Sequence, residues 1–398
     1  MSTVPVPLSA AASPAGSGTS GTSGTSGALS TPGMAATSGT LPLSRTGIPD
    51  TELREVLDGA APLWSALQGA HLLLTGATGW FGTWLLDALV AANREHGLGL
   101  RITAVARTPG HFAGLHPDLH GAAEIDWRAA DVREPLALAA PPTHVIHAAT
   151  AASAALNRAR PDVMFDTAAI GTRRVLEAAA GGACQSFLLL SSGAVYGTQP
   201  PALAGLPETW QGGPDPANVG NAYAEGKRAA EQYAAIAHAL HGVPVRIARC
   251  FAFVGPHMPF DTHFAIGNFI ANGVDRAPVV VKSDGSPRRS WLYMTDLVVW
   301  LLTVLVKGEV MRPYNVGSDE STTVGAVAQR IAAACGVECR IEGRPGEPAH
   351  AYVPDVGRIV AELGVRRTVD LELAIARTCR WRPGQVGQGR AVRGDIHG

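Results

Sequence analysis

The feature that most constrains the fold is a glycine-rich turn between a short apolar run and an amphipathic segment. Residues 71–74 read HLLL, which is typical of a buried parallel strand, and residues 75–82 read TGATGWFG. Apolar residues then recur at helical spacing from Phe81 to Ala92. A strand, a glycine-rich turn and a helix in this order favour a dinucleotide-binding unit over a purely structural turn.

Each glycine of this turn has its own expected task. Gly76 allows the tight turn, Gly79 lets a pyrophosphate approach the backbone, and Gly82 lets the helix pack close to the strand. Free amide groups at the start of the helix would hold the phosphates. We therefore expect the turn to bind the cofactor through Gly76, Thr78, Gly79, Trp80, Phe81 and Gly82.

Strand-like and helix-like segments alternate along the next part of the chain. We expect strands near 101–106, 124–129, 143–148, 186–191 and 244–249, and helices near 80–96, 161–180 and 221–241. This alternation predicts an α/β protein with a Rossmann-type, doubly wound parallel sheet. After Gly255 and Pro256 the alternation ends and shorter elements follow.

Two further motifs carry chemistry. Residues 187–197 read FLLLSSGAVYG, a buried strand that runs out into hydroxyl groups, and residues 223–227 read YAEGK. Tyr223 and Lys227 are four residues apart and share one face of a helix. Hydride transfer at a secondary alcohol needs an acid or base, and a nearby ammonium lowers the pKa of a tyrosine from its usual value of about 10. We expect Ser192, Tyr223 and Lys227 to be catalytic, with the serine bonding the substrate oxygen.

These motifs, with VIHAAT at 145–150, RSWLYMTD at 289–296 and YNVGS at 314–318, resemble the extended short-chain dehydrogenase/reductase family. That family contains NAD-dependent nucleotide-sugar epimerases, dehydratases and ketoreductases. The resemblance covers the chain from about residue 70 to the C-terminus. It implies a smaller C-terminal substrate-binding lobe, and it places cofactor contacts at Asp131, Val132, His147, Ala148, Ala149, Tyr223 and Lys227.

The choice between NAD and NADP depends on the end of the second strand. NAD sites carry an acidic residue about twenty residues after the glycines, where it bonds the ribose 2′-hydroxyl. Residues 101–108 read RITAVART and contain no carboxylate. Arg107 could pair with a 2′-phosphate, or it could stack on the adenine. The sequence leaves NAD and NADP open, with a lean toward NADP.

The resemblance also suggests a nucleotide-diphosphate sugar as substrate. Arg289 matches the family arginine that clamps a diphosphate, although a surface salt bridge is its alternative role. Ser192 and Gly193 are expected beside the sugar, and Asn268 is a further contact by position alone. Dehydrating relatives carry an Asp-Glu pair where this chain has Gly193 and Ala194, and decarboxylating relatives carry a glutamate at the second position.

Without these acids, the expected activity is that of a C4 epimerase or a 4-ketoreductase. Three alternatives stay open. The chain could be a nucleotide-sugar dehydratase or decarboxylase, a reductase of a non-sugar hydroxy or keto compound, or a non-catalytic NAD(P)-binding regulator. An intact set of serine, tyrosine and lysine argues against the regulator.

Charge and composition limit the partners. The chain has 398 residues and a net charge of −1, so we expect no nucleic-acid partner, and no apolar run reaches the roughly 18 residues of a membrane span. Five cysteines without a paired framework suggest reduced, cytoplasmic thiols. His116 and His120 are separated by Pro117 and lack a paired acid, so we expect no metal site. The family resemblance implies a homodimer formed through the helices near 161–180 and 221–241.

The chain is expected to have four segments. Residues 1–45 form a disordered tail rich in serine, glycine and threonine, with GTS repeated in tandem. Residues 46–69 form a helical extension and residues 70–255 form the NAD(P)-binding Rossmann domain. Residues 256–398 form mainly the substrate-binding lobe, interleaved with the core.

Overall fold

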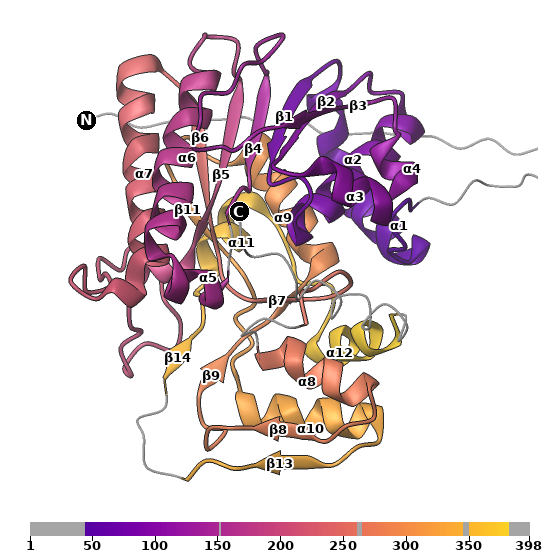
Figure 1. The fold of residues 1–398 in the computed structure, drawn as a ribbon, viewed down its shortest axis with the longest axis vertical. Coiled ribbons are helices and arrows are strands. Elements are labelled where there is room, and N and C mark those ends of the chain that lie inside the picture. The colour runs from indigo at the N-terminus through magenta and orange to yellow at the C-terminus, as the bar shows by residue number, and fades with distance from the viewer. Residues whose placement is uncertain (1–43, 151–152, 261–264, 345–349, 382–398) are drawn as a thin grey trace, which may run out of the picture. The chain divides into compact units, whose positions relative to one another are not determined.

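The computed structural model describes residues 44–150, 153–260, 265–344 and 350–381, so nearly all of the expected tail lies outside the described residues (Figure 1). A seven-stranded sheet consists of β1 (His71–Thr75), β2 (Arg101–Ala106), β3 (Ile125–Ala129), β4 (His144–His147), β5 (Ser186–Ser192), β6 (Val245–Cys250) and β11 (Pro313–Val316). The strand order is β11-β6-β5-β4-β1-β2-β3, and every neighbouring pair is parallel. This topology confirms the predicted doubly wound sheet.

Helices connect the strands and cover the sheet. Those of the N-terminal half are α1 (Asp50–Gly59), η1 (Ala61–Leu67), α2 (Trp80–His96), α3 (Pro109–Leu115), α4 (Pro117–His120), α5 (Ala154–Ala159) and α6 (Pro161–Ala179). The rest are η2 (Gly193–Tyr196), η3 (Val219–Asn221), α7 (Ala222–His241), α8 (Ala265–Val274), α9 (Met294–Lys307), α10 (Val324–Cys335), α11 (Gly357–Leu363) and α12 (Leu371–Arg380). The predicted strands and long helices therefore agree with the structure to within one or two residues.

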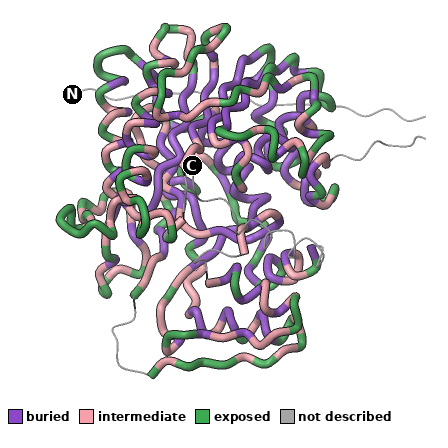
Figure 2. Tube along the Cα trace, viewed as in Figure 1, coloured by how far each residue is buried: buried purple, intermediate pink, exposed green. Residues whose placement is uncertain are grey.

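The two faces of the sheet bury different sets of side chains, because successive residues of a strand point to opposite sides. Leu72 and Leu74 belong to a core shared with α1, η1, α2 and α9. Leu73 and Val145 belong to a second core shared with α6 and α7. Strands β1, β4 and β5 are consequently buried along their whole length, and Figure 2 shows buried chain at the centre of the sheet.

The N-terminal helical segment is part of the first core. Its apolar side chains are almost fully buried: Leu53, Val56, Leu57, Leu63, Trp64 and Leu67. Burial of one such side chain stabilises a fold by about 1.5–3 kcal/mol. Residues 50–67 are therefore integrated with the sheet and do not lie on it as a loose extension.

Elements after residue 256 contribute to two separate apolar cores. Helix α9 and strand β11 return to the Rossmann core, which the sequence pattern did not predict in detail. Helices α8, α10 and α12 share a separate apolar cluster with β8 (Val279–Val281). The other short strands are β7 (Phe253–Val254), β9 (Arg288–Arg289), β10 (Leu292–Tyr293), β12 (Thr322–Thr323), β13 (Cys339–Ile341) and β14 (Ala351–Tyr352).

Candidate active site

A cavity of about 830 Å³ lies at the carboxyl ends of β1, β4 and β5. The strand order reverses between β1 and β4, and such a reversal is where open α/β sheets bind ligands. The structure brings many of the predicted residues to this cavity. They are Gly76, Gly79, Trp80, Phe81, Gly82, Ala148, Ser192, Tyr223, Lys227 and Arg289.

The glycine turn has the shape of a phosphate cradle. Gly76 has a φ of 70°, and a Cβ there would lie 2.8 Å from the backbone of Ala148. A Cβ on Gly82 would lie 2.3 Å from the carbonyl oxygen of Gly76, whereas one on Gly79 would meet only that oxygen, at 3.2 Å. Helix α2 begins at Trp80, and the first amides of a helix have no intrahelical partner. These residues fit the diphosphate of a dinucleotide.

The predicted adenine end lies outside the cavity lining. Arg107 is exposed just beyond the end of β2. Asp131 forms an ion pair with Arg133 at 2.7 Å, and the nearby guanidinium groups of Arg133 and Arg107 lower its pKa. Val132 is buried and contacts the helix at Gly171. The exposed guanidinium of Arg107 thus lies near a carboxylate as well as a second cation.

The three residues at the end of β4 have different surroundings. His147 is enclosed, and its ring nitrogens bond the hydroxyls of Thr75 at 2.7 Å and Thr172 at 3.0 Å. Burial lowers its pKa to about 3, so the ring is neutral and has no nitrogen left for a ligand. Ala148 lines the cavity, and the amide of Ala149 donates to Thr75 Oγ1 at 3.3 Å. Thr78, in the glycine turn, is half-buried and does not line the cavity.

The serine, tyrosine and lysine meet at the inner end of the cavity. Lys227 is 2% exposed, and its Nζ donates to the carbonyl of Leu190 at 2.7 Å. The same Nζ lies 6.0 Å from the ring centre of Tyr223. Ser192, which ends β5, lies close enough to Tyr223 for its hydroxyl to lower the pKa of the phenol. Ser192 is thus brought from a distant part of the sequence to the same end of the cavity as Tyr223 and Lys227.

The protonation of Tyr223 differs from the prediction. Burial raises the pKa of its phenol to about 12, and the hydrogen bond to Ser192 offsets this rise only in part. The expected lowering by Lys227 is wrong for this structure, because the ammonium is distant and is directed at a carbonyl oxygen. At neutral pH Tyr223 is therefore a proton donor.

Burial also affects the other ionisable groups beside the phenol. It lowers the pKa of Lys227 to about 8, although Cys250 and Glu231 oppose this effect. The lysine thus keeps its charge at neutral pH. Burial raises the pKa of Cys250 to about 12, so this thiol stays protonated and is unsuited to act as a base.

Arg289 faces the cavity from β9. Its Nη1 donates to the carbonyls of Arg288 at 2.8 Å and His350 at 3.0 Å, and among the described residues no carboxylate forms an ion pair with it. Burial lowers its pKa. This guanidinium is therefore available to an anion. Asn268, in contrast, lies on an exposed position of α8 and is not among the cavity-lining residues, so the structure does not bring it to the site.

Gly193 is covered by two aromatic side chains that the sequence analysis missed. A Cβ on Gly193 would lie 2.6 Å from the ring of Phe251 and 2.7 Å from the hydroxyl of Tyr352. Both aromatic residues line the cavity, and their ring centres are 4.7 Å apart. Gly193 itself is buried behind them and does not line the cavity, contrary to its expected place beside the sugar. No motif marked Tyr352, because it lies on a two-residue strand.

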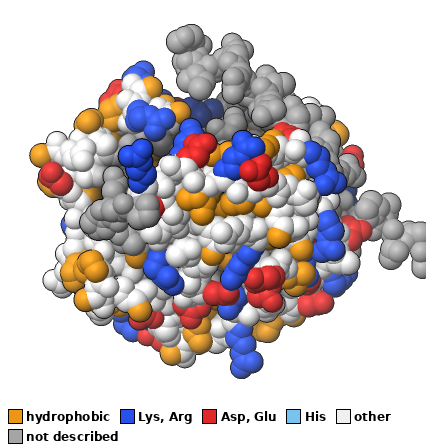
Figure 3. All heavy atoms as spheres, turned by 90° about the horizontal axis from the view of Figure 1, so that it is seen from below, with side chains coloured by type: hydrophobic (Ala, Val, Ile, Leu, Met, Phe, Trp, Pro, Cys, Tyr) orange, Lys and Arg blue, Asp and Glu red, His pale blue; other side chains and the backbone are white. Residues whose placement is uncertain are grey.

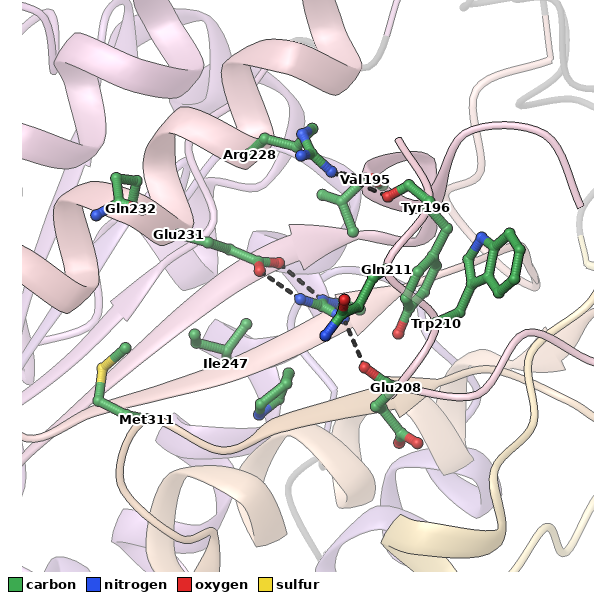
Figure 4. A pocket seen from close by; sticks show the side chains of 13 residues that line it. Val195, Tyr196, Glu208, Trp210, Gln211, Arg228, Glu231, Gln232, Ile247 and Met311 are labelled. Carbon is green, nitrogen blue, oxygen red and sulfur yellow. Dashed lines mark hydrogen bonds and ion pairs between the residues drawn. The ribbon is translucent and has the colours of Figure 1, made fainter. Parts of the chain in front are cut away.

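A second cavity, of about 440 Å³, lies elsewhere along α7 and β6 (Figure 4). Glu231 and Arg249 point toward each other across it and form an ion pair at 2.6 Å. Arg249 also lies over the ring of Tyr196, 4.8 Å from its centre. Glu231 accepts a hydrogen bond from Ser191, next to Ser192. Glu231 thus pairs with Arg249 within this cavity and also contacts Ser191, the neighbour of the active-site residue Ser192.

Figure 3 shows one face of the molecule, on which acidic and basic side chains are intermixed. In the described part of the chain, no group of three or more histidine, cysteine or acidic side chains is placed to hold a metal ion. Among those same residues, no helix has the length and apolar character to span a bilayer.

Comparison with known proteins gives consistent matches. A model of the NAD dependent epimerase/dehydratase family matches residues 72–317. UDP-glucuronic acid decarboxylase 2 of Arabidopsis thaliana is 30% identical over 318 residues, which cover 79% of this chain and 68% of that protein. The dTDP-glucose 4,6-dehydratase of Streptomyces griseus is 27% identical over 320 residues, or 78% and 93% of the two chains.

Solved structures show the same fold. An epimerase of Methanothermobacter thermautotrophicus superposes with a TM-score of 0.70 at 21% identity, and the match covers 85% of this chain and 98% of that one. The dTDP-glucose 4,6-dehydratase DesIV of Streptomyces venezuelae, solved with NAD bound, superposes with a TM-score of 0.69 at 23% identity. That match covers 80% of this chain and 98% of the neighbour.

Proposed function

Because the chain belongs to the NAD-dependent epimerase/dehydratase family, we propose that it oxidises or reduces one carbon of a nucleotide sugar, as a C4 epimerase or a 4-ketoreductase. One observation carries the proposal. Ser192 of β5, Tyr223 and Lys227 of α7, and Arg289 of β9 come from three different elements and meet at one cavity, beside the glycine turn. A hydroxyl, a phenol, a buried ammonium and an unpaired guanidinium are suited to a substrate with both an alcohol and a diphosphate.

NAD is the proposed cofactor. When bound, it would supply the acceptor or donor of the hydride at the sugar carbon. The closely packed turn at Gly76 and Gly82 would hold its diphosphate, and Lys227 would hold its ribose. The family's name and the NAD-bound dehydratase of Streptomyces venezuelae support NAD, whereas the lean toward NADP rested on Arg107 and on the lack of a carboxylate at the end of the second strand.

Tyr223, Lys227 and Ser192 have separate proposed roles around the reacting sugar oxygen. The phenol of Tyr223 is protonated at neutral pH and would donate its proton to a keto oxygen. In the opposite direction, the phenolate would take the proton of the sugar hydroxyl. The ammonium of Lys227 stays charged, but it is directed at the carbonyl of Leu190, so its proposed role is to hold the cofactor ribose. Ser192, which lines the same cavity, would hold the same oxygen.

The surroundings of Gly193 support an epimerase or reductase over an elimination enzyme. Phe251 and Tyr352 occupy the space of a side chain at residue 193, so an aspartate there would need both rings to move. Ala194 lines the cavity and supplies no acid. Decarboxylases and dehydratases are nevertheless among the relatives, so loss of carbon dioxide or of water is the alternative outcome of any substrate test.

A homodimer through α6 and α7 is part of the proposal. Large apolar side chains are exposed on these helices: Phe165 is 36%, Ile236 43% and Leu240 71% exposed. In a stable dimer these side chains would be buried against their mates. Sedimentation velocity on the purified protein tests this, and a single monomeric species at micromolar concentration would contradict it. The expected cytoplasmic location rests on cysteine usage and stays a prediction.

The replacement Tyr223→Phe tests the proposed chemistry. Removal of the proton-transferring hydroxyl should lower turnover of a nucleotide sugar by about a hundredfold or more, since general acid–base catalysis contributes that much. Calorimetric titration with NAD should show an affinity close to that of the wild type. Wild-type turnover in this variant would remove Tyr223 from the catalytic role and, with it, the proposed mechanism.

A further inference from the structure

Tyr352 is the one phenol besides Tyr223 that lines the cavity within the described residues, and the proposed chemistry does not use it. It comes from β14, whose register places it opposite Arg289 on β9. Its hydroxyl lies 2.7 Å from the position of a Cβ on Gly193, next to Ser192. Arg289 and Tyr352 thus enter the site from neighbouring strands of the same small sheet.

Ser192 lies between two phenols. Both phenols line the cavity with it, and the Ser192 hydroxyl acts on the pKa of each, lowering that of Tyr223 and that of Tyr352. A substrate oxygen held by Ser192 would therefore be within reach of both tyrosines. Each phenol has a different positively charged side chain as its neighbour. Lys227 lies near Tyr223, whereas Arg289 lies opposite Tyr352 on the paired strand.

The hydroxyl of Tyr352 is held in place by packing. Its ring lies 4.7 Å from that of Phe251, centre to centre, and Phe251 is in turn 6.2 Å from Tyr196. Gly193 leaves the space that the hydroxyl fills. A fixed donor loses little freedom when it bonds a ligand, so this arrangement is pre-organised.

The Tyr352 phenol also stays protonated. Burial and the nearby Tyr223 raise its pKa above the usual value of a phenol. Tyr352 therefore remains a hydrogen-bond donor throughout the physiological pH range. Two phenols with different neighbours can take different roles in one reaction.

We propose that Tyr352 is a further catalytic residue, whose hydroxyl donates a hydrogen bond to the sugar oxygen at the reacting carbon. This inference rests on the proposed function and deepens it. As the alcohol is oxidised, its proton would pass to the phenolate form of Tyr223 and its hydride to oxidised NAD, which leaves a ketone, the Tyr223 phenol and reduced NAD, while Tyr352 keeps its own proton. Its bond strengthens as the oxygen gains negative charge in the reverse, reductive step.

The location of the Tyr352 hydroxyl also bears on which reaction the site favours. Dehydrating relatives are expected to carry carboxylates just after the serine, whereas here a neutral phenol fills the space beside Gly193. A neutral donor can polarise a ketone, but it is a poor base at neutral pH for the removal of a proton from carbon. Tyr352 would thereby favour oxidation and reduction over elimination.

The test compares Tyr352→Phe with a matched change at Tyr196. Tyr196 is packed on the same Phe251, but its hydroxyl bonds Asn315 at 2.7 Å and faces the second cavity (Figure 4). Stopped-flow absorbance at the NADH band would follow hydride transfer from UDP-glucose, UDP-N-acetylglucosamine, UDP-glucuronic acid and dTDP-glucose. Calorimetry would give the affinity for the reactive sugar nucleotide, and thermal melting would report folding.

We expect Tyr352→Phe to slow hydride transfer by about a hundredfold, with little change in affinity, as for loss of one oxyanion donor. Tyr196→Phe should leave the rate within about twofold, although it lowers the melting temperature. Wild-type hydride transfer in Tyr352→Phe, together with a large loss in Tyr223→Phe, would overturn this inference and leave the proposed function intact. Wild-type rates in both variants would overturn both, as would a wild type that neither transfers hydride from any of these sugars nor oxidises NADH with the 4-keto form of dTDP-glucose.

Discussion

Gly82→Ala is the replacement that most strongly tests the cofactor site. A Cβ at this position would lie 2.3 Å from the oxygen of Gly76 and 2.5 Å from that of Ala77, whereas ordinary contact begins at 3.4 Å. Both neighbours are backbone atoms, so the start of α2 must move by about 1 Å to restore contact distances. Overpacking of this kind costs about 1–3 kcal/mol.

The same movement would displace the amides that are proposed to hold the diphosphate. Since 1.4 kcal/mol corresponds to a tenfold change in an equilibrium constant, we expect the affinity for NAD to fall by about tenfold to a hundredfold. Calorimetric titration with NAD and urea unfolding would measure the two effects. Gly114→Ala on α3 is the matched control, because nothing lies within 4 Å of its Cβ position. Wild-type affinity in Gly82→Ala would refute the assignment of the turn.

Two further predictions concern charge. Arg289→Ala should weaken binding of UDP by about tenfold or more while NAD binding is unchanged, since a charge-assisted hydrogen bond contributes about 1.5–3 kcal/mol; equal UDP affinity would argue against a diphosphate clamp. Asp87 accepts hydrogen bonds from Ser44, Arg45 and Thr46, and burial raises its pKa from 3.8 to about 6. Its contribution to stability is therefore full below pH 3.8 and is lost as the pH rises through 6, by about 3 kcal/mol in all. Asp87→Asn cannot ionise, so urea unfolding at several pH values should show a flatter dependence than the wild type; an unchanged slope would contradict the burial argument.

Much of the fold could be predicted because its signals are local. The run at residues 71–74 and the glycines after it have a period and spacing that hardly depend on the rest of the chain. Strand β11 was not predicted as a member of the main sheet, because it has only four residues and follows the end of the alternating pattern. Its pairing with β6 depends on how α9 packs, and that packing is a long-range property.

Active-site residues could be predicted where they belong to a single sequence motif. Tyr223 and Lys227 share a helix face, so their meeting follows from their spacing. The direction of the pKa shift at Tyr223 was not predictable, because it depends on burial and on where the lysine ammonium points. Tyr352 was missed for a related reason: its place beside Ser192 arises from strand pairing between β14 and β9.

Product analysis tests the central claim most directly. The purified protein would be incubated with NAD and, separately, with UDP-glucose, UDP-N-acetylglucosamine, UDP-glucuronic acid, dTDP-glucose and the 4-keto form of the last. Mass spectrometry and proton NMR would identify the products. The account predicts an epimer of unchanged mass, or reduction of the ketone by two hydrogens when NADH is supplied, with both products formed about a hundredfold or more slowly in Tyr223→Phe. Loss of water or carbon dioxide from a nucleotide sugar would contradict it.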